Sequence, residues 1–450
     1  MAELLSVPLK KSSDVDIVKP LKNLIQSTYS SGTNTEDYSD ALNELSRLRS
    51  NAIWKVFEKS SLELIYSYYD QLVALESKIP PQEVQIPFKW KDAFDKGSFF
   101  GGRMSLTISS LAYERMCVLF NIGAMQSAVA AQQPLDTEDS LKLAAKLLQQ
   151  AAGVFAYLKA NIMMAVHQET TPDLNPDTLH ALSQLMLAQA QEVIAYKCIR
   201  DEMKESMVAK VCAQCEELYA DALRCAQREG QRALWDRDWI PTMQAKQSAF
   251  RGLAQYYQSL VCRANKAVGE EIARLQVAVE QLKLAGAGAG GGALLQEGGA
   301  RAARHLQEAR RDNDFIYHER VPEPSQLEPV ARAWRACGRA RSCSTPRCPR
   351  WACPPRWSGR TRAGCRTRWR RRRRRCGRRG GCRPSRASWP TCPTCCSGTR
   401  TSWTRRSACC ARRRRRTRRC ARSWARGGRA PPRPRSRPPS APTPTSTARS

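Results

Sequence analysis

Apolar residues recur at helical spacing along most of the first 290 residues. Residues three and four positions apart share one face of a helix, so this spacing predicts a succession of amphipathic helices. The first follows the capping residues Asn34 and Thr35, and the second ends before Pro80. Further helices are predicted over about 107–132, 136–158, 175–228, 268–284 and 299–311, with another beginning at Pro241.

The predicted helix over 175–228 has a clear start signal. Asn175 is a suitable cap, and Pro176 occupies the first helical position, where its missing N–H costs nothing. We expect this helix to run without a break to about Arg228. The sequence therefore predicts one long helix in the second third of the chain.

One interval interrupts the helical pattern. Residues 84–90 alternate between apolar and polar side chains, as a short β-strand does. They lead to Phe99 and Phe100, which are flanked by glycines and mark a turn or loop tip. Two placements are open for these phenylalanines, namely an exposed apolar tip or a position tucked back into the core.

Long amphipathic helices, short connectors and no alternation of strands with helices predict an all-α fold. We expect a helical solenoid or elongated bundle with a small early β element. Such folds usually present surfaces to partners. No run of about eighteen apolar residues predicts a membrane span, and the start lacks the features of a secretory signal, so we expect a cytoplasmic protein.

The net charge of +33 is an average over two unlike parts. Residues 331–450 contain 38 Arg and no Lys, Asp or Glu, whereas residues 1–330 hold 36 basic and 41 acidic side chains. The body therefore carries a net charge of −5, and attraction to polyanions is expected only of the tail. Of 19 cysteines, 13 lie in the tail, and the six in the body lack the spacing of a disulfide framework, which suits a reducing compartment.

The tail uses only Ala, Arg, Cys, Gly, Pro, Ser, Thr and Trp. These are the residues whose codons have G or C at the middle position, whereas selection for disorder favours Glu, Lys and Gln. We infer that residues 331–450 are an out-of-frame translation of a GC-rich gene, starting near residues 330–335. Because the tail has no large aliphatic residue, we expect it to be disordered. The alternative is a nucleic-acid-binding protein that uses arginine runs such as 370–375 and 412–416.

Motifs of catalysis and metal binding do not occur in the expected spacings. The four histidines are scattered, and there is no phosphate-binding loop, dinucleotide fingerprint, nucleophile elbow or zinc-protease motif, so we expect no enzyme activity and no cofactor. Cys212 and Cys215 form a lone Cys-x-x-Cys, which within a helical pattern more often packs than binds zinc or cycles redox. A zinc protein using Cys392, Cys395 and Cys396 is a third hypothesis, although no patterned core surrounds these residues.

Four stretches of the body resemble the Bro-one domain family. They read WKDAFDKGSFFGG at 90–102, MLAQAQEV at 186–193, GEEIARLQ at 269–276 and DNDFIYHERVP at 312–322. With VPLKK at 7–11, the resemblance covers about residues 1–330. It implies a curved helical solenoid related to tetratricopeptide repeats, with a small early sheet. It also implies a non-catalytic ESCRT-associated adaptor that binds the C-terminal amphipathic helix of an ESCRT-III subunit of the charged multivesicular body protein class.

The resemblance also implies the residues that bind this helix, namely Ile194, Met207 and Val211. Methionine and β-branched side chains suit a shallow groove for a partner helix, although from the residues alone these positions are more typical of a core. The family more usually has Phe and Ile at positions 194 and 207, so we expect a groove of different detailed shape. On the neighbouring predicted helix, one face carries three charged residues expected near the rim: Glu138, Lys142 and Lys146.

Two further sites follow from the resemblance. Tyr317 lies in a stretch similar to one that Src-type kinases phosphorylate and their SH2 domains bind, and its alternative role is a partly buried anchor of the chain end. Phe100, next to Phe99, matches a loop residue that the family links to membrane or viral nucleocapsid contact. The implied roles are multivesicular body sorting, cytokinetic abscission and virus budding, with recruitment to endosomes and the midbody.

The resemblance ends at about residue 330. Related chains continue into a V-shaped helical domain and a proline-rich region, and here the tail stands in their place. We therefore expect no partners of those two regions. We also expect the Bro-one-like domain, residues 1–330, to be incomplete at its C-terminal end, followed by the low-complexity tail at 331–450.

Overall fold

The computed structural model describes residues 4–29, 38–53, 59–79, 83, 85–95, 104–286 and 293–333. All of them belong to one compact unit that spans Met1–Arg360. The predicted loop tip at Phe99 and Phe100, and residues 334–450 of the tail, lie outside the described residues. The expectation of disorder is wrong for the first three tail residues, 331–333, because the Ala333 N–H donates to the Lys210 carbonyl oxygen and Arg332 pairs with Glu217.

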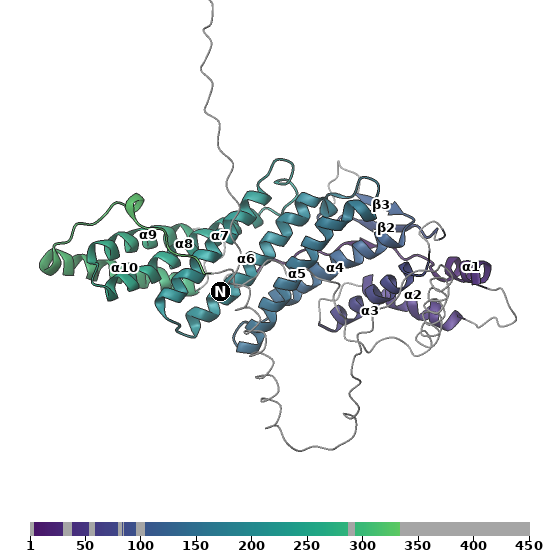
Figure 1. Cartoon of the computed structure of the whole chain (residues 1–450), viewed down its shortest axis with the longest axis horizontal. Coiled ribbons are helices and arrows are strands. Elements are labelled where there is room, and N and C mark those ends of the chain that lie inside the picture. Colours follow the sequence, from purple (N-terminus) through teal and green to yellow (C-terminus); the bar gives the residue numbers. More distant parts are fainter. Residues whose placement is uncertain are drawn as a thin grey trace, which may run out of the picture. The chain divides into compact units, whose positions relative to one another are not determined.

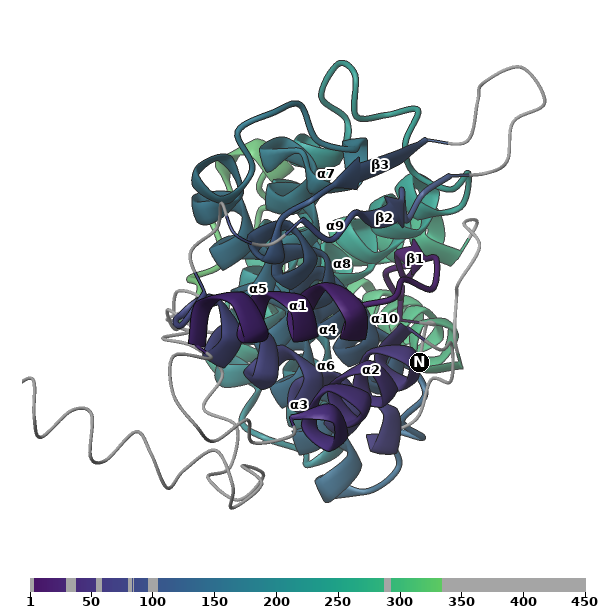
Figure 2. The ribbon, with the colours of Figure 1, turned by 90° about the vertical axis from the view of Figure 1, so that its right-hand side faces the viewer.

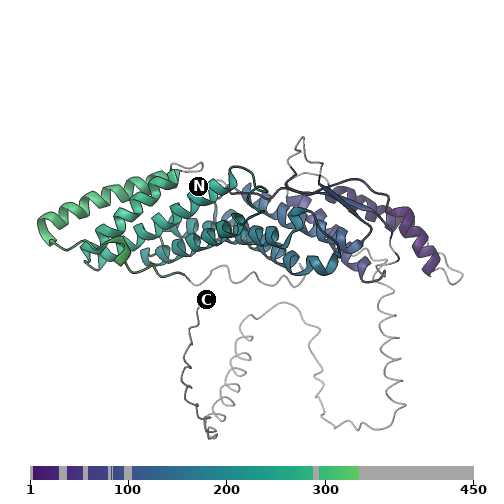
Figure 3. The same cartoon turned by 90° about the horizontal axis from the view of Figure 1, so that it is seen from above.

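Helices dominate the described part of the chain (Figure 1). Three come first, namely α1 (Val18–Tyr29), α2 (Ser39–Ile53) and α3 (Lys59–Glu76). Seven longer ones follow: α4 (Leu111–Ala131), α5 (Glu138–Ala165), α6 (Pro176–Arg200), α7 (Glu205–Ala226), α8 (Trp239–Ala264), α9 (Val268–Gly286) and α10 (Ala293–Asp312). From α4 to α10 each helix packs mainly on its neighbours in sequence, which makes a single array when seen from above (Figure 3). The predicted all-α solenoid with a small β element is confirmed.

A three-stranded antiparallel sheet lies beside the first helices (Figure 2). Its central strand is β2 (Phe88–Lys91), which pairs with β1 (Lys11–Ser12) and β3 (Ser105–Ile108). The predicted helix over 107–132 therefore starts too early, because Thr107 lies in β3. Helix α4 begins only after Ser110, whose side chain accepts a hydrogen bond from the Tyr113 N–H and so caps the helix.

The prediction of one unbroken helix over 175–228 is wrong. Helix α6 ends at Arg200 and α7 begins at Glu205, and the chain reverses between them. Glu202 adopts a φ of 47°, which breaks the helical backbone. No glycine or proline marks this turn, and both helices are apolar on the sides that face each other, so the periodicity continues across it.

Buried charges fix the first helices to the sheet. Arg49 of α2 pairs with Glu114 of α4 at 2.9 Å, and both side chains are almost fully buried. Glu114 also accepts hydrogen bonds from the Tyr68 hydroxyl and the Trp90 indole N–H. Trp90 of the first family-like stretch thus joins β2 to α4, which is a structural role.

The extended segment before β1 is held by side-chain amides and a hydroxyl. The Leu5 N–H and C=O bond the two amide atoms of Gln189 on α6, at 2.6 and 2.9 Å. The Lys10 N–H and C=O bond Asn121 of α4 in the same way, at 2.8 and 3.0 Å. Between them, the Val7 N–H donates to the Ser127 hydroxyl. The stretch at 186–193 therefore also positions the start of the chain.

Candidate interaction surface

Hydrogen bonds set the register between α6 and α7. The Gln191 side-chain amide donates to the Val211 carbonyl oxygen at 3.4 Å, and the Cys215 thiol contacts the Ala188 carbonyl oxygen at 3.8 Å. The two helices are antiparallel, so one turn from Val211 toward the connecting turn brings Met207 level with Ile194. The three predicted contact residues therefore come together on two helices, where the sequence placed them on one.

Exposure differs among these three side chains. Met207 is 45% exposed and Ile194 is half-buried against the core, whereas Val211 is only 5% exposed. The Met207 side chain therefore projects into solvent, whereas the Val211 side chain is almost completely buried. A partner that contacts this region meets Met207 first.

A fourth exposed apolar residue, which the sequence did not single out, lies in the turn that connects the two helices. Met203 lies in the turn between α6 and α7, where its N–H donates to the Cys198 carbonyl oxygen at 3.1 Å, and it is exposed to the same extent as Met207. Its position four residues before Met207 was the available signal. We call Ile194, Met203, Met207 and Val211 the α6–α7 patch.

Charged side chains border the α6–α7 patch. Glu138 in the first turn of α5 pairs with Lys142 at 2.9 Å and with Lys197 of α6 at 3.4 Å. These contacts, led by the hydrogen bond from Lys142, lower the pKa of Glu138. Lys197, one turn after Ile194, thus links the α5 rim to the patch, and Lys146 is exposed one turn further along α5. Exposed ion pairs contribute little to stability, so these charges remain available to a partner.

Tyr317 lies far along the chain from the patch, in a single π-helical turn, η2 (Asn313–Tyr317), that follows α10. Phe315 is 80% exposed, and Ile316 and Tyr317 are also exposed. His318 then adopts a left-handed backbone with φ of 54°, which ends the turn.

The buried cysteines of α7 pack within the core. Cys212 and Cys215 are fully buried, and burial raises the pKa of the Cys212 thiol. Within the described ranges, no three or more His, Cys, Asp or Glu side chains are arranged to hold a metal ion. Nor is any helix in that part of the chain long and apolar enough to cross a membrane.

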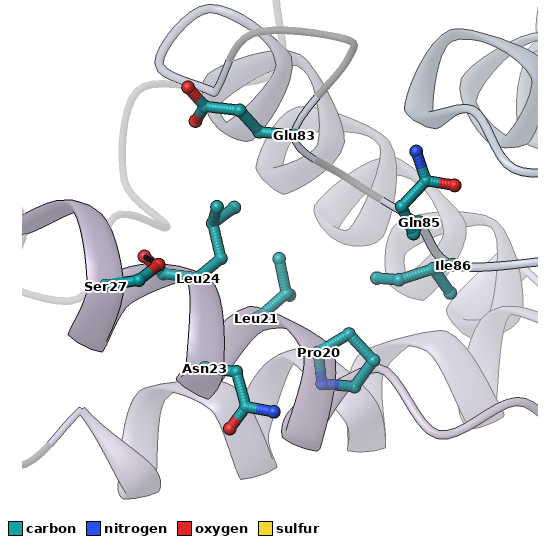
Figure 4. Close-up of a pocket in the computed structure, with 8 residues that line it drawn as sticks. All are labelled: Pro20, Leu21, Asn23, Leu24, Ser27, Glu83, Gln85 and Ile86. Carbon is teal, nitrogen blue, oxygen red and sulfur yellow. Dashed lines mark hydrogen bonds between the residues drawn. The ribbon is translucent and has the colours of Figure 1, made fainter.

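A pocket of about 370 Å³ lies between α1 and the residues Glu83, Gln85 and Ile86 (Figure 4). Leu21, Leu24 and Ile86 give it apolar walls, and Asn23 and Gln85 stand at its edge. None of its lining residues belongs to the α6–α7 patch or to the charged rim. The pocket therefore adds no support to the predicted binding site.

An array of helices that exposes an apolar patch with a charged rim has the character of a scaffold for protein partners. The chain belongs to the BRO1-like domain family, whose model matches residues 4–337. This confirms the family resemblance of the sequence.

Relatives and solved structures agree with this membership. The programmed cell death 6-interacting protein of Xenopus laevis is 42% identical over 337 residues, which are 74% of this chain and 38% of that protein. The vacuolar protein-sorting protein BRO1 of Gibberella zeae is 35% identical over 73% of this chain and 34% of its own length. A structure described as "ALIX BRO1 CHMP4C complex" superposes with a TM-score of 0.69 at 41% identity, covering 74% of this chain and 94% of that one. The chain spans less than two-fifths of the length of these two curated relatives.

Proposed function

We propose that this chain is a non-catalytic ESCRT-associated adaptor that binds the C-terminal amphipathic helix of an ESCRT-III subunit at the α6–α7 patch. The observation that carries the proposal is the exposed Met207 beside half-buried Ile194, bordered by the Glu138–Lys197 pair. An amphipathic helix offers an apolar stripe with polar edges, which matches this arrangement. The solved BRO1 domain in complex with CHMP4C supports the choice of partner.

The proposal includes the cellular role that the family resemblance implies. The adaptor acts in multivesicular body sorting, in abscission during cytokinesis and in virus budding, and it is recruited from the cytoplasm to endosomes and the midbody. The name of the fungal vacuolar sorting relative supports the first of these roles.

Two further contacts belong to the proposal. The exposure of Tyr317 supports phosphorylation there and binding of a Src-type SH2 domain. Contact of Phe99 and Phe100 with an endosomal membrane or a viral nucleocapsid rests on the family resemblance alone.

The substitution Met207→Asp tests the partner site. Binding would bury the introduced carboxylate against apolar groups, and an unpaired buried charge is costly, so we expect roughly a hundredfold loss of affinity, which corresponds to about 2.7 kcal/mol. Calorimetry with a synthetic ESCRT-III C-terminal helix measures this loss. Met164→Asp is the matched control, because Met164 is 73% exposed at the end of α5 and lies outside the patch.

Both variants should unfold at the wild-type temperature, since each methionine is exposed. Equal binding by the folded Met207→Asp protein and the wild type would show that the helix does not dock on the α6–α7 patch. Equal losses in both variants would also contradict the site, because they would point to a general effect of the added charge.

A further inference from the structure

Residues 318–333 form an extended segment, which we call the C-terminal strap. It starts at His318 after the exposed η2 turn, contains one short helical turn, η3 (Pro324–Gln326), and returns along α9 to reach α7. It thus joins the end of the array to one of the two helices that carry the α6–α7 patch.

The first part of the strap is anchored at the start of α9. Asn313 donates to the Glu319 carbonyl oxygen at 3.0 Å and accepts from the Glu319 N–H at 2.8 Å. The Glu319 carboxylate accepts a hydrogen bond from the Gly269 N–H at 2.8 Å. A carboxylate at this position also interacts favourably with the positive N-terminal end of the α9 dipole.

Gly269 is needed for this anchorage. A Cβ atom at position 269 would lie 2.4 Å from the Arg320 carbonyl oxygen, well inside van der Waals contact. The backbone of the strap therefore rests directly on the backbone of α9. Any larger residue at 269 must push the strap away.

The middle of the strap is held by a buried arginine of α9. Arg274 donates to the Glu328 carbonyl oxygen at 2.9 Å. Its guanidinium also pairs with Glu270 at 2.6 Å and donates to Gln255 of α8 at 3.0 Å. Because its side chain is only 3% exposed, these partners fix it in one orientation.

The last part of the strap contacts α7 beside the patch. The Ala333 N–H donates to the Lys210 carbonyl oxygen at 3.0 Å, and Arg332 pairs with Glu217 at 2.5 Å. The other oxygen of the Glu217 carboxylate accepts from the buried Gln214 amide at 2.9 Å. On a helix of 100° per residue, Gln214 lies between the Lys210–Glu217 side of α7 and the side that carries Met207 and Val211.

We propose that the C-terminal strap positions α7 for partner binding, so that seating the strap on α9 sets the affinity of the α6–α7 patch. This inference rests on the proposed function and adds its regulation. Strap and patch share one helix, and Arg332 and Glu217 link the strap to Gln214, on the side of α7 next to the patch residues Met207 and Val211. The exposed turn at 315–317 directly precedes the strap, so a binding partner or a modification at this turn is in a position to displace the strap.

Gly269→Ala tests the coupling from the remote end. The new methyl group displaces the strap without touching α7, and alanine favours the helix more than glycine does. We expect about a fivefold weaker binding of the ESCRT-III helix by calorimetry, the lower end of common coupling effects. Gly286→Ala on the same helix is the matched control, because a Cβ there meets nothing within 4 Å, and it should bind as the wild type does.

Arg332→Ala removes the ion pair with Glu217 at the other end of the strap and should weaken binding by a smaller factor, because Arg332 is 60% exposed and the Ala333–Lys210 hydrogen bond remains. The double variant Gly269→Ala/Arg332→Ala should lose no more than the larger single loss, because both changes free the same segment. Hydrogen exchange reports directly whether the amides at 318–333 are released. A released strap with unchanged helix affinity, or losses that multiply in the double variant, would overturn the coupling.

A test of the strap's role does not require the proposed partner to be correct. If the wild type does not bind the helix, the proposed partner is wrong, and the coupling is then read from hydrogen exchange of α7. Gly269→Ala should still speed exchange at residues 207–217 while Gly286→Ala does not. Unchanged α7 exchange with a released strap would refute the positioning role on its own.

Discussion

The buried carboxyl group of Asp92 predicts a contribution to the stability of the domain that grows as the pH falls from 7 to 5. Asp92 follows β2 and is only 4% exposed. Its carboxylate accepts hydrogen bonds from the Phe94 N–H at 2.7 Å and the Asp173 N–H at 2.9 Å. Burial, followed by the charge of Asp173, raises the pKa of Asp92 to about 6, against the lowering effect of these bonds and of Lys10.

The sign and size follow from the two pKa values. An unfolded aspartate titrates near pH 3.9, so between pH 7 and 5 only the folded state takes up a proton at Asp92. The folded state binds that proton more tightly, so its stability rises as the pH falls through 6. For each pH unit over which only the folded state holds the proton, the free energy of unfolding rises by about 1.4 kcal/mol. Because Asp92 titrates only partly at each end of the range from pH 7 to 5, we expect a gain of about 1 kcal/mol.

Urea denaturation of the wild type and of Asp92→Asn at pH 7 and pH 5 measures this contribution. The asparagine cannot accept both backbone hydrogen bonds, so the variant should be less stable at both pH values, by roughly 1–2 kcal/mol at pH 7. Its stability lacks the titration of Asp92, while all other groups titrate in both proteins. The gap between the proteins should therefore widen by about 1 kcal/mol as the pH falls. A gap that stays constant or narrows would show that Asp92 is ionised in the fold at pH 5.

Three other predictions concern the core and the tail. Glu114→Ala leaves the buried Arg49 without its carboxylate and should lower the free energy of unfolding by about 3–5 kcal/mol, whereas Glu44→Ala removes only an exposed pair with Arg47 and should cost less than about 1 kcal/mol. Urea denaturation compares them, and similar costs would refute the argument from burial. For the proposed division near residue 330, the nucleotide sequence around codons 325–340 should restore an acidic, leucine-rich frame after a shift of one nucleotide. The chain truncated after Ala333 should keep helix binding. Salt-sensitive nucleic-acid binding by the full chain that is lost on truncation, with no helix binding by either chain, would instead favour the nucleic-acid hypothesis.

Long helices with clear start signals were predictable from the sequence. The acidic residues at 136–139 mark the start of α5, where Thr137 and Ser140 form reciprocal capping bonds, and Asn175 caps α6 by accepting from the Asp177 N–H. The alternation at 84–90 indicated β2, although this strand spans only 88–91. β1 was missed because two residues leave no readable alternation, and β3 because Thr107 and Ile108 were assigned to the following helix. The turn after Arg200 was missed because Glu202 carries its positive φ without a glycine.

The candidate site was predictable only in part. The family resemblance identified Met207 and Ile194 as contact residues. The fold places them at the same height on the antiparallel helices α6 and α7. Lys197 and Met203 were not named, since their positions beside the patch depend on the unpredicted turn. Helical spacing does not predict the contacts of Gly269 with Arg320 or of Arg274 with Glu328. Both contacts form only because the strap folds back along α9.

The α6–α7 patch also depends on buried charge beneath it. Glu192 of α6 pairs with Lys246 of α8 at 3.0 Å and accepts a hydrogen bond from Tyr219 of α7, and burial raises the pKa of this tyrosine. One carboxylate therefore ties together the two helices of the patch and the next helix of the array. A buried ion pair is costly to break, so Glu192 keeps α6, α7 and α8 packed together at this level of the array. We therefore expect the strap to act on affinity through shifts of residues 207–217 of α7 rather than through separation of α7 from α6.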